Sequence, residues 1–299
     1  MIYPKPLQPG DAIAIVSPAS KIDTKLVDSA CATLARWGFD PIVGRHCKGS
    51  CGSYSGTIDQ RLSDLREAAE NPKVRAVLCS RGGYGVVHLL SSLSPEFWKT
   101  DPKWIIGFSD ISALHAAAAA NGVASIHAPM CKHLTEHPDD ECSQALRRIL
   151  AGELPAYETK PNPLNHTGKA EGRIFGGNLA VLNGLVSTPY DLLKGDRILF
   201  IEDVGEEIYK VERMLYTLKL NGTLASLKAL IVGQFTEYHP SDDHTEMYDM
   251  IEKMMKSYDI PVVYDFPVGH VDRNLPIVEG AYASLAVDAD SVKLSFSKR

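Results

Sequence analysis

The chain has 299 residues, 44% of them hydrophobic and 23% charged, which is typical of a globular protein. Its 31 Lys and Arg residues against 37 Asp and Glu residues give a formal charge of -6, and no basic block is present, so nucleic acid and anionic membrane are disfavoured as partners. The length predicts two domains rather than one.

The N-terminal stretch MIYPKPLQPGD lacks a charged segment followed by an apolar one, and no apolar run is long enough to span a membrane. The six cysteines are scattered, several of them in apolar segments, which favours a reducing cytoplasm over a disulfide framework. His46, Cys47 and Cys51 lie close together, but no second ligand pair follows. We therefore expect a cytoplasmic protein without a metal.

Short apolar runs alternate with helical patterns in the first half of the chain. Strands are expected at 12–17, 40–43, 75–80 and 104–107, and helices at 24–37, 60–70, 86–93 and 111–120. These strands are apolar throughout instead of alternating, as strands covered on both faces are. The pattern predicts an α/β domain with a parallel sheet wrapped by helices.

A segment rich in Pro, Gly and polar residues interrupts this pattern and predicts a linker at 153–171, between domains at 1–152 and 172–299. The second half differs in character. It predicts strands at 197–203, 229–235 and 261–267, a helix at 211–222 and a C-terminal hairpin within 283–297.

Proteins with parallel sheets bind their ligands at the carboxyl ends of the strands. Three segments at such strand ends contain candidate functional residues. The first is the loop CSRGGYG, whose Gly82, Gly83 and Gly85 permit unusual dihedral angles and close approach of a ligand. A glycine turn needed only for packing explains the pattern equally well. Phosphate binding is disfavoured because the spacing matches no known phosphate loop.

The second segment is WIIGFSDISALH, in which Ser109 lies between a strand and a helix. The arrangement is similar to a nucleophile elbow but lacks the second glycine of G-x-S-x-G. The Asp110 amide, at the start of the helix, could stabilise an oxyanion. Read locally, the segment favours Ser109 or Asp110 as the helix N-cap over a nucleophile.

The third is a pair of segments, RILFIEDVGEE and YDFPVGHVDRNLP, which supply an acid and a base. A serine hydroxyl needs a base to become a nucleophile, and the base needs a carboxylate to orient it. Glu202 or Asp203 can provide the carboxylate. His270 or His127 can provide the base, whereas His88 and His115 fall within helical patterns and are expected to pack.

Taken together, these segments resemble the LD-carboxypeptidase family of serine peptidases. The matching stretches occur in order along nearly the whole chain: PGDAIAIVSPAS, YSGTIDQRLSDLREAAENPKVRAVLCSRGGYG, IIGFSDISALH, IHAPM, GGNLAVLNGL, LFIEDVGEEIYKVERML and FPVGHVDRNLPIVEGAYASL. The resemblance implies a Rossmann-like N-terminal domain and a smaller, β-rich α/β C-terminal domain. One departure is Ala128, where relatives commonly have glycine.

The resemblance also implies a catalytic triad of Ser109, Glu202 and His270, and so selects Glu202 over Asp203 and His270 over His127. The backbone amides of the RGGYG loop and of Asp110 are expected to form the oxyanion hole, with Gly83 favoured over Gly82 as the loop donor. No organic cofactor is expected.

The substrate implied is a murein tetrapeptide, cut before its terminal D-alanine during cell-wall recycling. Arg81 is a candidate partner for the substrate carboxylate, and Gly82 and Asn178 are candidate substrate contacts. A homodimer is compatible with the resemblance. Two alternatives stay open: a microcin-immunity-type hydrolase of peptide–nucleotide conjugates, and a non-catalytic peptide-binding protein.

Overall fold

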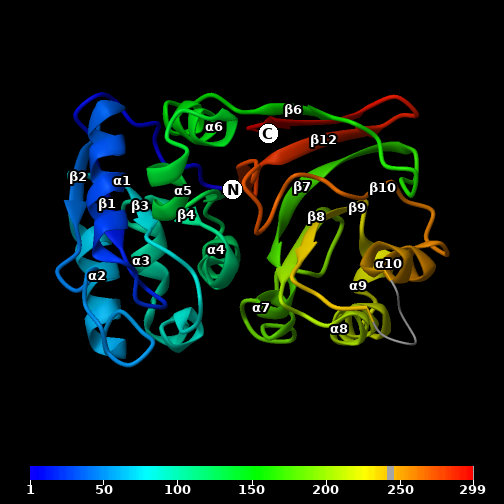
Figure 1. Ribbon diagram of the computed structural model, residues 1–299, viewed down its shortest axis with the longest axis horizontal. Coiled ribbons are helices and arrows are strands. Elements are labelled where there is room, and N and C mark those ends of the chain that lie inside the picture. The colour runs from blue at the N-terminus through cyan, green and yellow to red at the C-terminus, as the bar shows by residue number, and fades with distance from the viewer. Residues whose placement is uncertain (241–245, 299) are drawn as a thin grey trace. The chain divides into compact units, whose positions relative to one another are not determined.

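The computed structural model describes residues 1–240 and 246–298, which form two compact units. The first comprises Met1–Glu153 and Leu275–Glu279, and the second comprises Leu154–Asn274 and Gly280–Arg299. Each unit has its own sheet and its own helices (Figure 1). No helix of the described residues is long and apolar enough to cross a membrane.

The first unit is built on a six-stranded sheet in the order β11-β5-β4-β3-β1-β2. Five strands are parallel, and β11 is antiparallel to β5. The strands are β1 (Ala12–Val16), β2 (Asp40–Val43), β3 (Val74–Cys79), β4 (Trp104–Gly107), β5 (Ser125–His127) and β11 (Ile277–Glu279). All residues of β1 and β4 are buried, which confirms the predicted parallel sheet.

Helices connect these strands, and three of them confirm the helices predicted at 24–37, 60–70 and 111–120, whereas those at 95–99, 131–136 and 141–150 were not predicted from the sequence. They are α1 (Thr24–Arg36), α2 (Ile58–Glu70), α3 (Pro95–Lys99), α4 (Ser112–Ala120), α5 (Cys131–Glu136) and α6 (Glu141–Leu150). The prediction of one helix at 86–93 is wrong. That segment forms two short 3-10 turns, η1 (Val86–His88) and η2 (Leu90–Ser92), because Gly85, with a φ of +122°, precedes the first turn and Pro95 begins the next helix.

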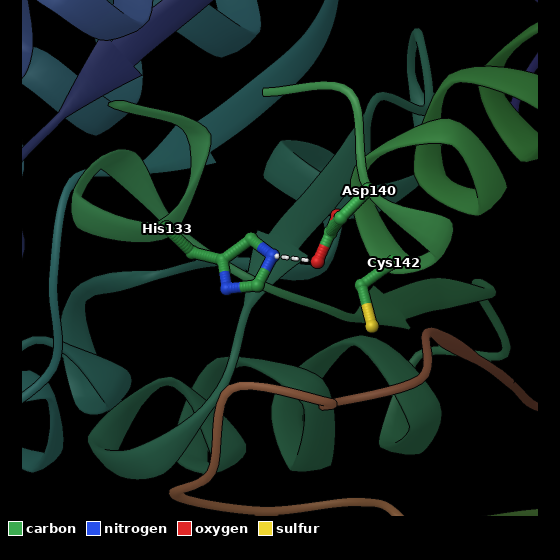
Figure 2. Close-up of side chains that lie close together, drawn as sticks. All are labelled: His133, Asp140 and Cys142. Atoms are coloured by element: carbon green, nitrogen blue, oxygen red, sulfur yellow. Dashed lines mark hydrogen bonds and ion pairs between the residues drawn. The ribbon is translucent and has the colours of Figure 1, made fainter. Parts of the chain in front are cut away.

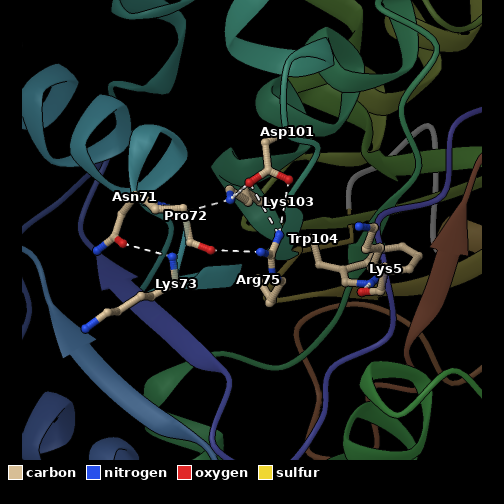
Figure 3. A network of polar contacts seen from close by, with 8 residues as sticks. All are labelled: Lys5, Asn71, Pro72, Lys73, Arg75, Asp101, Lys103 and Trp104. Carbon is tan, nitrogen blue, oxygen red and sulfur yellow. Dashed lines mark hydrogen bonds and ion pairs between the residues drawn. The ribbon is translucent and has the colours of Figure 1, made fainter.

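A polar network fixes the start of β4 beside the start of β3 (Figure 3). The Arg75 guanidinium donates to the Asp101 carboxylate at 3.1 Å and to the Pro72 carbonyl at 2.8 Å. Lys103 is 5% exposed, and its ammonium pairs with Asp101 and donates to the Asn71 carbonyl at 3.2 Å. A buried ammonium is tolerated only when it is paired in this way. The network therefore helps to set the register of the strand that leads to Ser109.

The second unit contains a seven-stranded sheet in the order β10-β9-β8-β7-β12-β13-β6. Strands β10, β9, β8 and β7 are parallel, and the remaining three pair antiparallel. The strands are β6 (Ala156–Thr159), β7 (Gly168–Asn178), β8 (Arg197–Val204), β9 (Ala229–Thr236), β10 (Val262–Val263), β12 (Tyr282–Val287) and β13 (Val292–Ser297). Its helices are α7 (Leu179–Asn183), α8 (Ile208–Leu220), α9 (Thr223–Ser226) and α10 (Met247–Met255).

Two predictions for this half need correction, and one is confirmed. The expected linker at 153–171 carries β6 and the first residues of β7, whose polar, alternating side chains resemble loop sequence because these strands are solvated on one face. The strand expected at 261–267 has only two residues. The predicted C-terminal hairpin is confirmed, with Tyr282 opposite Ser297 and Val287 opposite Val292.

Candidate active site

The turn after β4 holds Ser109 in a conformation that side chains rarely adopt. Its φ is +66°, whereas the preceding residue, Phe108, is extended. The left-handed region costs an L-residue roughly 1–2 kcal/mol, and such strain is concentrated at functional sites. A sharp strand-to-helix turn with a serine at its apex is the geometry of a nucleophile elbow.

Neither Ser109 nor Asp110 is the helix N-cap, so the local capping interpretation is wrong. The cap position of the short 3-10 turn η3 (Ser109–Ile111) is Phe108, and that of α4 is Ile111. The Asp110 carboxylate instead accepts a hydrogen bond from the Val86 amide at 2.9 Å. Asp110 therefore connects the elbow to the glycine loop.

The glycine loop touches the elbow directly. A Cβ atom added at Gly82 would lie 2.7 Å from the Ser109 Cβ and 3.2 Å from the Asp110 amide nitrogen, so any side chain there would displace the serine. Gly83 has a φ of +106°. Within residues 1–240 and 246–298, the amides of Gly83 and Asp110 donate to no acceptor. These are the two amides expected to form the oxyanion hole.

Arg61 holds the far side of this loop, and sequence reasoning missed it. It is 2% exposed, and Nη1 donates to the carbonyls of Pro18 at 2.7 Å and Gly85 at 2.8 Å. The sequence does contain a signal for it: Arg61 falls on the same helical face as Leu65 and Ala68, and that face is buried. A charged residue on a buried helical face indicates a specific partner. Burial raises the pKa of Asp110 to about 6, although the Val86 amide and the Arg61 charge oppose this rise.

Strand β8 of the second unit ends with two adjacent carboxylates that serve different purposes. Successive side chains of a strand point to opposite faces. Glu202 is fully buried, and its Oε2 lies 2.7 Å from Nδ1 of His270. Asp203 accepts hydrogen bonds from the Asn178 amide group and the Ala180 backbone amide, both at 2.8 Å. The acid that contacts the histidine is therefore Glu202.

The turn that carries His270 depends on Gly269. Its φ is +129°, and an added Cβ would lie 2.9 Å from the Cβ of Glu202. The Gly269 amide donates to the Asn274 side chain at 2.9 Å, which fixes the turn. Burial tends to lower the pKa of His270, but the hydrogen bond and the charge of Glu202 outweigh it and raise that pKa above its usual value. The pair thus resembles the acid–base half of a triad.

The other candidates have their own contacts. Asn178 caps α7 through the Val181 amide at 3.1 Å, so both ends of its side chain are engaged. Arg81 donates to the Lys21 carbonyl at 3.1 Å. His127 is buried in β5, where its ring lies 5.7 Å from that of Phe108. His115 is a packing residue, as expected, and contacts the Gly107 carbonyl at 2.8 Å.

Comparison with known proteins identifies the family. The LD-carboxypeptidase N-terminal domain matches residues 13–128, and the C-terminal domain of that family matches residues 171–285. A murein tetrapeptide carboxypeptidase from Pseudomonas aeruginosa is 33% identical over 89% of this chain and 91% of its own.

Two further comparisons cover almost the whole chain. The crystal structure of a muramoyltetrapeptide carboxypeptidase from Oxalobacter formigenes has a TM-score of 0.88 and 27% identity, covering 96% of this chain and 98% of that one. The microcin C7 self-immunity protein MccF of Escherichia coli is 28% identical over 98% of this chain and 95% of its own. The chain belongs to the LD-carboxypeptidase family and is a serine-type carboxypeptidase.

Proposed function

We propose that this carboxypeptidase removes the terminal D-alanine of murein tetrapeptides in the cytoplasm, during cell-wall recycling, with Ser109, His270 and Glu202 as its triad. The observation that carries the assignment of the acid and base is the fully buried Glu202 carboxylate, 2.7 Å from His270. A buried carboxylate at Nδ1 leaves Nε2 of the imidazole as the atom that exchanges protons with substrate and nucleophile.

The reaction begins when Nε2 of His270 takes the proton of the Ser109 hydroxyl, whose oxygen attacks the carbonyl carbon of the scissile peptide bond. The carbonyl oxygen becomes an oxyanion that accepts hydrogen bonds from the amides of Gly83 and Asp110. One such donor is typically worth roughly 10²–10³ in rate. Glu202 stabilises the imidazolium that forms.

The intermediate then collapses, and the peptide C–N bond breaks as His270 returns its proton to the amine of D-alanine. The remaining tripeptide is an ester of Ser109. His270 next removes a proton from water, whose oxygen attacks this ester, and the proton is passed to the departing Ser109 oxygen. Each cycle consumes one water, releases one D-alanine and one tripeptide, and requires no redox partner.

Other residues are assigned to binding and support. Arg81 donates one N–H to the Lys21 carbonyl. Its guanidinium group has further N–H donors, and their geometry suits the terminal carboxylate of the substrate. The Gly82 backbone packs beside the nucleophile, and we assign it a contact with the substrate next to the scissile bond. Asn178 supports the acid strand through Asp203, and we assign it a positioning role.

The experiment compares two substrates of different chemistry. Purified protein is incubated with a murein tetrapeptide and, separately, with a processed microcin, a peptide–nucleotide conjugate of the kind that the likeness to MccF suggests. Mass spectrometry should show loss of one D-alanine from the tetrapeptide and no such reaction with the Ser109→Ala variant. Turnover of the conjugate alone would replace the recycling assignment with an immunity function.

A further inference from the structure

A cluster of potential metal ligands lies in the first unit, where α5 ends and α6 begins (Figure 2). It consists of His133, Asp140 and Cys142, each offering one ligand atom, and these atoms all lie within 4.8 Å of one another. The three residues fall within a stretch of ten, so their proximity is set by the local chain. None of them belongs to the proposed triad or to the glycine loop.

We propose that these three side chains bind one divalent ion of borderline softness, for which Zn²⁺ is the representative. Imidazole nitrogen, carboxylate oxygen and thiolate sulfur are the ligand types that zinc takes in proteins. The aspartate and the thiolate would balance the charge of the ion. A fourth position is left to water.

The distances are close to those that the ion requires. Nε2 of His133 lies 3.0 Å from Oδ2 of Asp140. Zinc–ligand bonds of about 2.0–2.3 Å place neighbouring ligand atoms of a tetrahedral site about 3.3–3.7 Å apart. The ion would therefore replace the hydrogen bond between the imidazole and the carboxylate, and the sulfur would move by about an ångström at most.

The surroundings also suit a bound ion. Cys142 is 0% exposed, whereas the side chains of His133 and Asp140 are 13% and 34% exposed, so the cluster is protected on one side and reachable from the other. The second carboxylate oxygen, Oδ1 of Asp140, accepts from the Ser143 amide at 2.8 Å and fixes the orientation of the group. A ligand held by such a hydrogen bond loses less freedom when the ion binds.

The expected consequence is mechanical rather than catalytic. Helix α5 is tied to α1 through the Thr33 hydroxyl, which donates to the Leu134 carbonyl at 2.9 Å. An ion joining His133 to the first turn of α6 would hold these helices together, and the folded chain presents the three ligand atoms in a more fixed arrangement than the unfolded chain does. Because a ligand that binds the folded state more tightly than the unfolded state stabilises it, the ion should raise the unfolding temperature and leave turnover unchanged.

The test uses the full chain, freed of metal by a chelator and titrated with Co²⁺, which takes zinc sites and gives a charge-transfer band when bound to thiolate. One equivalent should produce the band, and a proton should leave the thiol as the sulfur binds. The Cys142→Ala variant should show no band. His133→Gln should weaken binding about tenfold or more, as should Asp140→Asn, which keeps an oxygen for the Ser143 amide.

The control is Cys51→Ser, which removes an exposed cysteine outside the cluster and should leave the band intact. Circular dichroism before titration confirms that each variant is folded. Zn²⁺ should raise the melting temperature of the wild type and of Cys51→Ser but not of Cys142→Ala. Absence of stoichiometric binding, or binding that is equal in the wild type and Cys142→Ala, would show that His133 and Asp140 form only a hydrogen-bonded brace.

Discussion

The turn at Ser109 and the Glu202–His270 pair depend on different parts of the chain, the first on backbone conformation and the second on a contact between side chains. The turn consists of backbone: a positive φ at the serine, glycines that allow close approach, and amides that lack acceptors within the described part of the chain. The pair consists of two side chains, the fully buried carboxylate of Glu202 and the partly exposed imidazole of His270, whose Oε2 and Nδ1 atoms lie 2.7 Å apart. The first should respond to changes of shape, and the second to changes of charge.

The largest effect is expected from Ser109→Ala. Removal of the hydroxyl abolishes the acyl intermediate, so kcat/KM should fall roughly 10⁴-fold or more. The rate of D-alanine release and the affinity for the tetrapeptide are measured separately. Affinity should change little, because the backbone that binds the substrate is retained; retention of hydrolysis would exclude Ser109 as the nucleophile.

Glu202→Gln tests the charge of the second region. It should lower kcat/KM by roughly 10²–10⁴, because the imidazole loses its orienting carboxylate. Glu202 raises the pKa of His270, and His270 acts as a base only when neutral. The acidic limb of the pH profile of kcat/KM should therefore move to lower pH in the variant.

The matched control is Asp203→Asn, which removes the neighbouring carboxylate of the same strand. Asp203 faces Asn178 and Ala180, so the acidic limb should move less than in Glu202→Gln. An equal shift in both variants would contradict the division of roles between the two carboxylates.

Gly82→Ala tests the shape of the first region. The added methyl group would lie 2.7 Å from the Ser109 Cβ, and displacement of the nucleophile by about an ångström costs roughly 10²-fold in kcat/KM. Gly184→Ala also adds a methyl group, but its nearest contact is 3.3 Å, and turnover should stay close to that of the wild type. Similar rates for both variants would show that Gly82 does not support the serine.

Arg61→Lys should act on stability and turnover together. A lysine cannot reproduce the planar hydrogen bonds to the carbonyls of Pro18 and Gly85, so the free energy of unfolding should fall by about 2–3 kcal/mol. If Arg61 positions the glycine loop, kcat should also fall at saturating substrate. Urea unfolding measures the stability, and steady-state assays measure kcat. A loss of stability with an unchanged kcat would show that Arg61 supports the fold but does not position the glycine loop for catalysis.

The smallest effect is expected from Ser109→Gly. Glycine adopts a positive φ without the steric cost that a side chain incurs, so the inactive variant should be about 1 kcal/mol more stable than the wild type. Urea unfolding at equilibrium measures this difference, with Ser109→Ala as the comparison. A variant no more stable than Ser109→Ala would argue against strain at the elbow.

The sequence could predict those parts of the fold in which the physical signal is local. The buried strands of the first unit and the C-terminal hairpin follow from hydrophobic pattern and turn residues. Strand β6 and the start of β7 were missed because half-solvated strands resemble a polar loop. Strand β11 (Ile277–Glu279) belongs to the sheet of the first unit because it pairs with β5. The two strands are far apart in the sequence, so no local pattern predicts this pairing.

The candidate site divides in the same way. Sequence reading located Ser109 at a turn but could not separate a cap from an elbow, since that choice depends on φ and on the partner of Asp110. It could not separate Glu202 from Asp203 without knowing which strand face meets His270. The helical pattern shows only that Arg61 is a charged residue in a helix. Its partners, the carbonyls of Pro18 and Gly85, are distant in the sequence, so the pattern cannot predict these contacts.

The most direct test of the triad is a double-mutant cycle of Ser109→Ala and His270→Ala, with kcat/KM for the murein tetrapeptide measured in all four proteins. Residues that act as one unit are strongly non-additive. The double variant should be about as slow as the slower single variant. If the two losses instead multiply, Ser109 and His270 act independently, and the assignment of His270 as the base for Ser109 is contradicted.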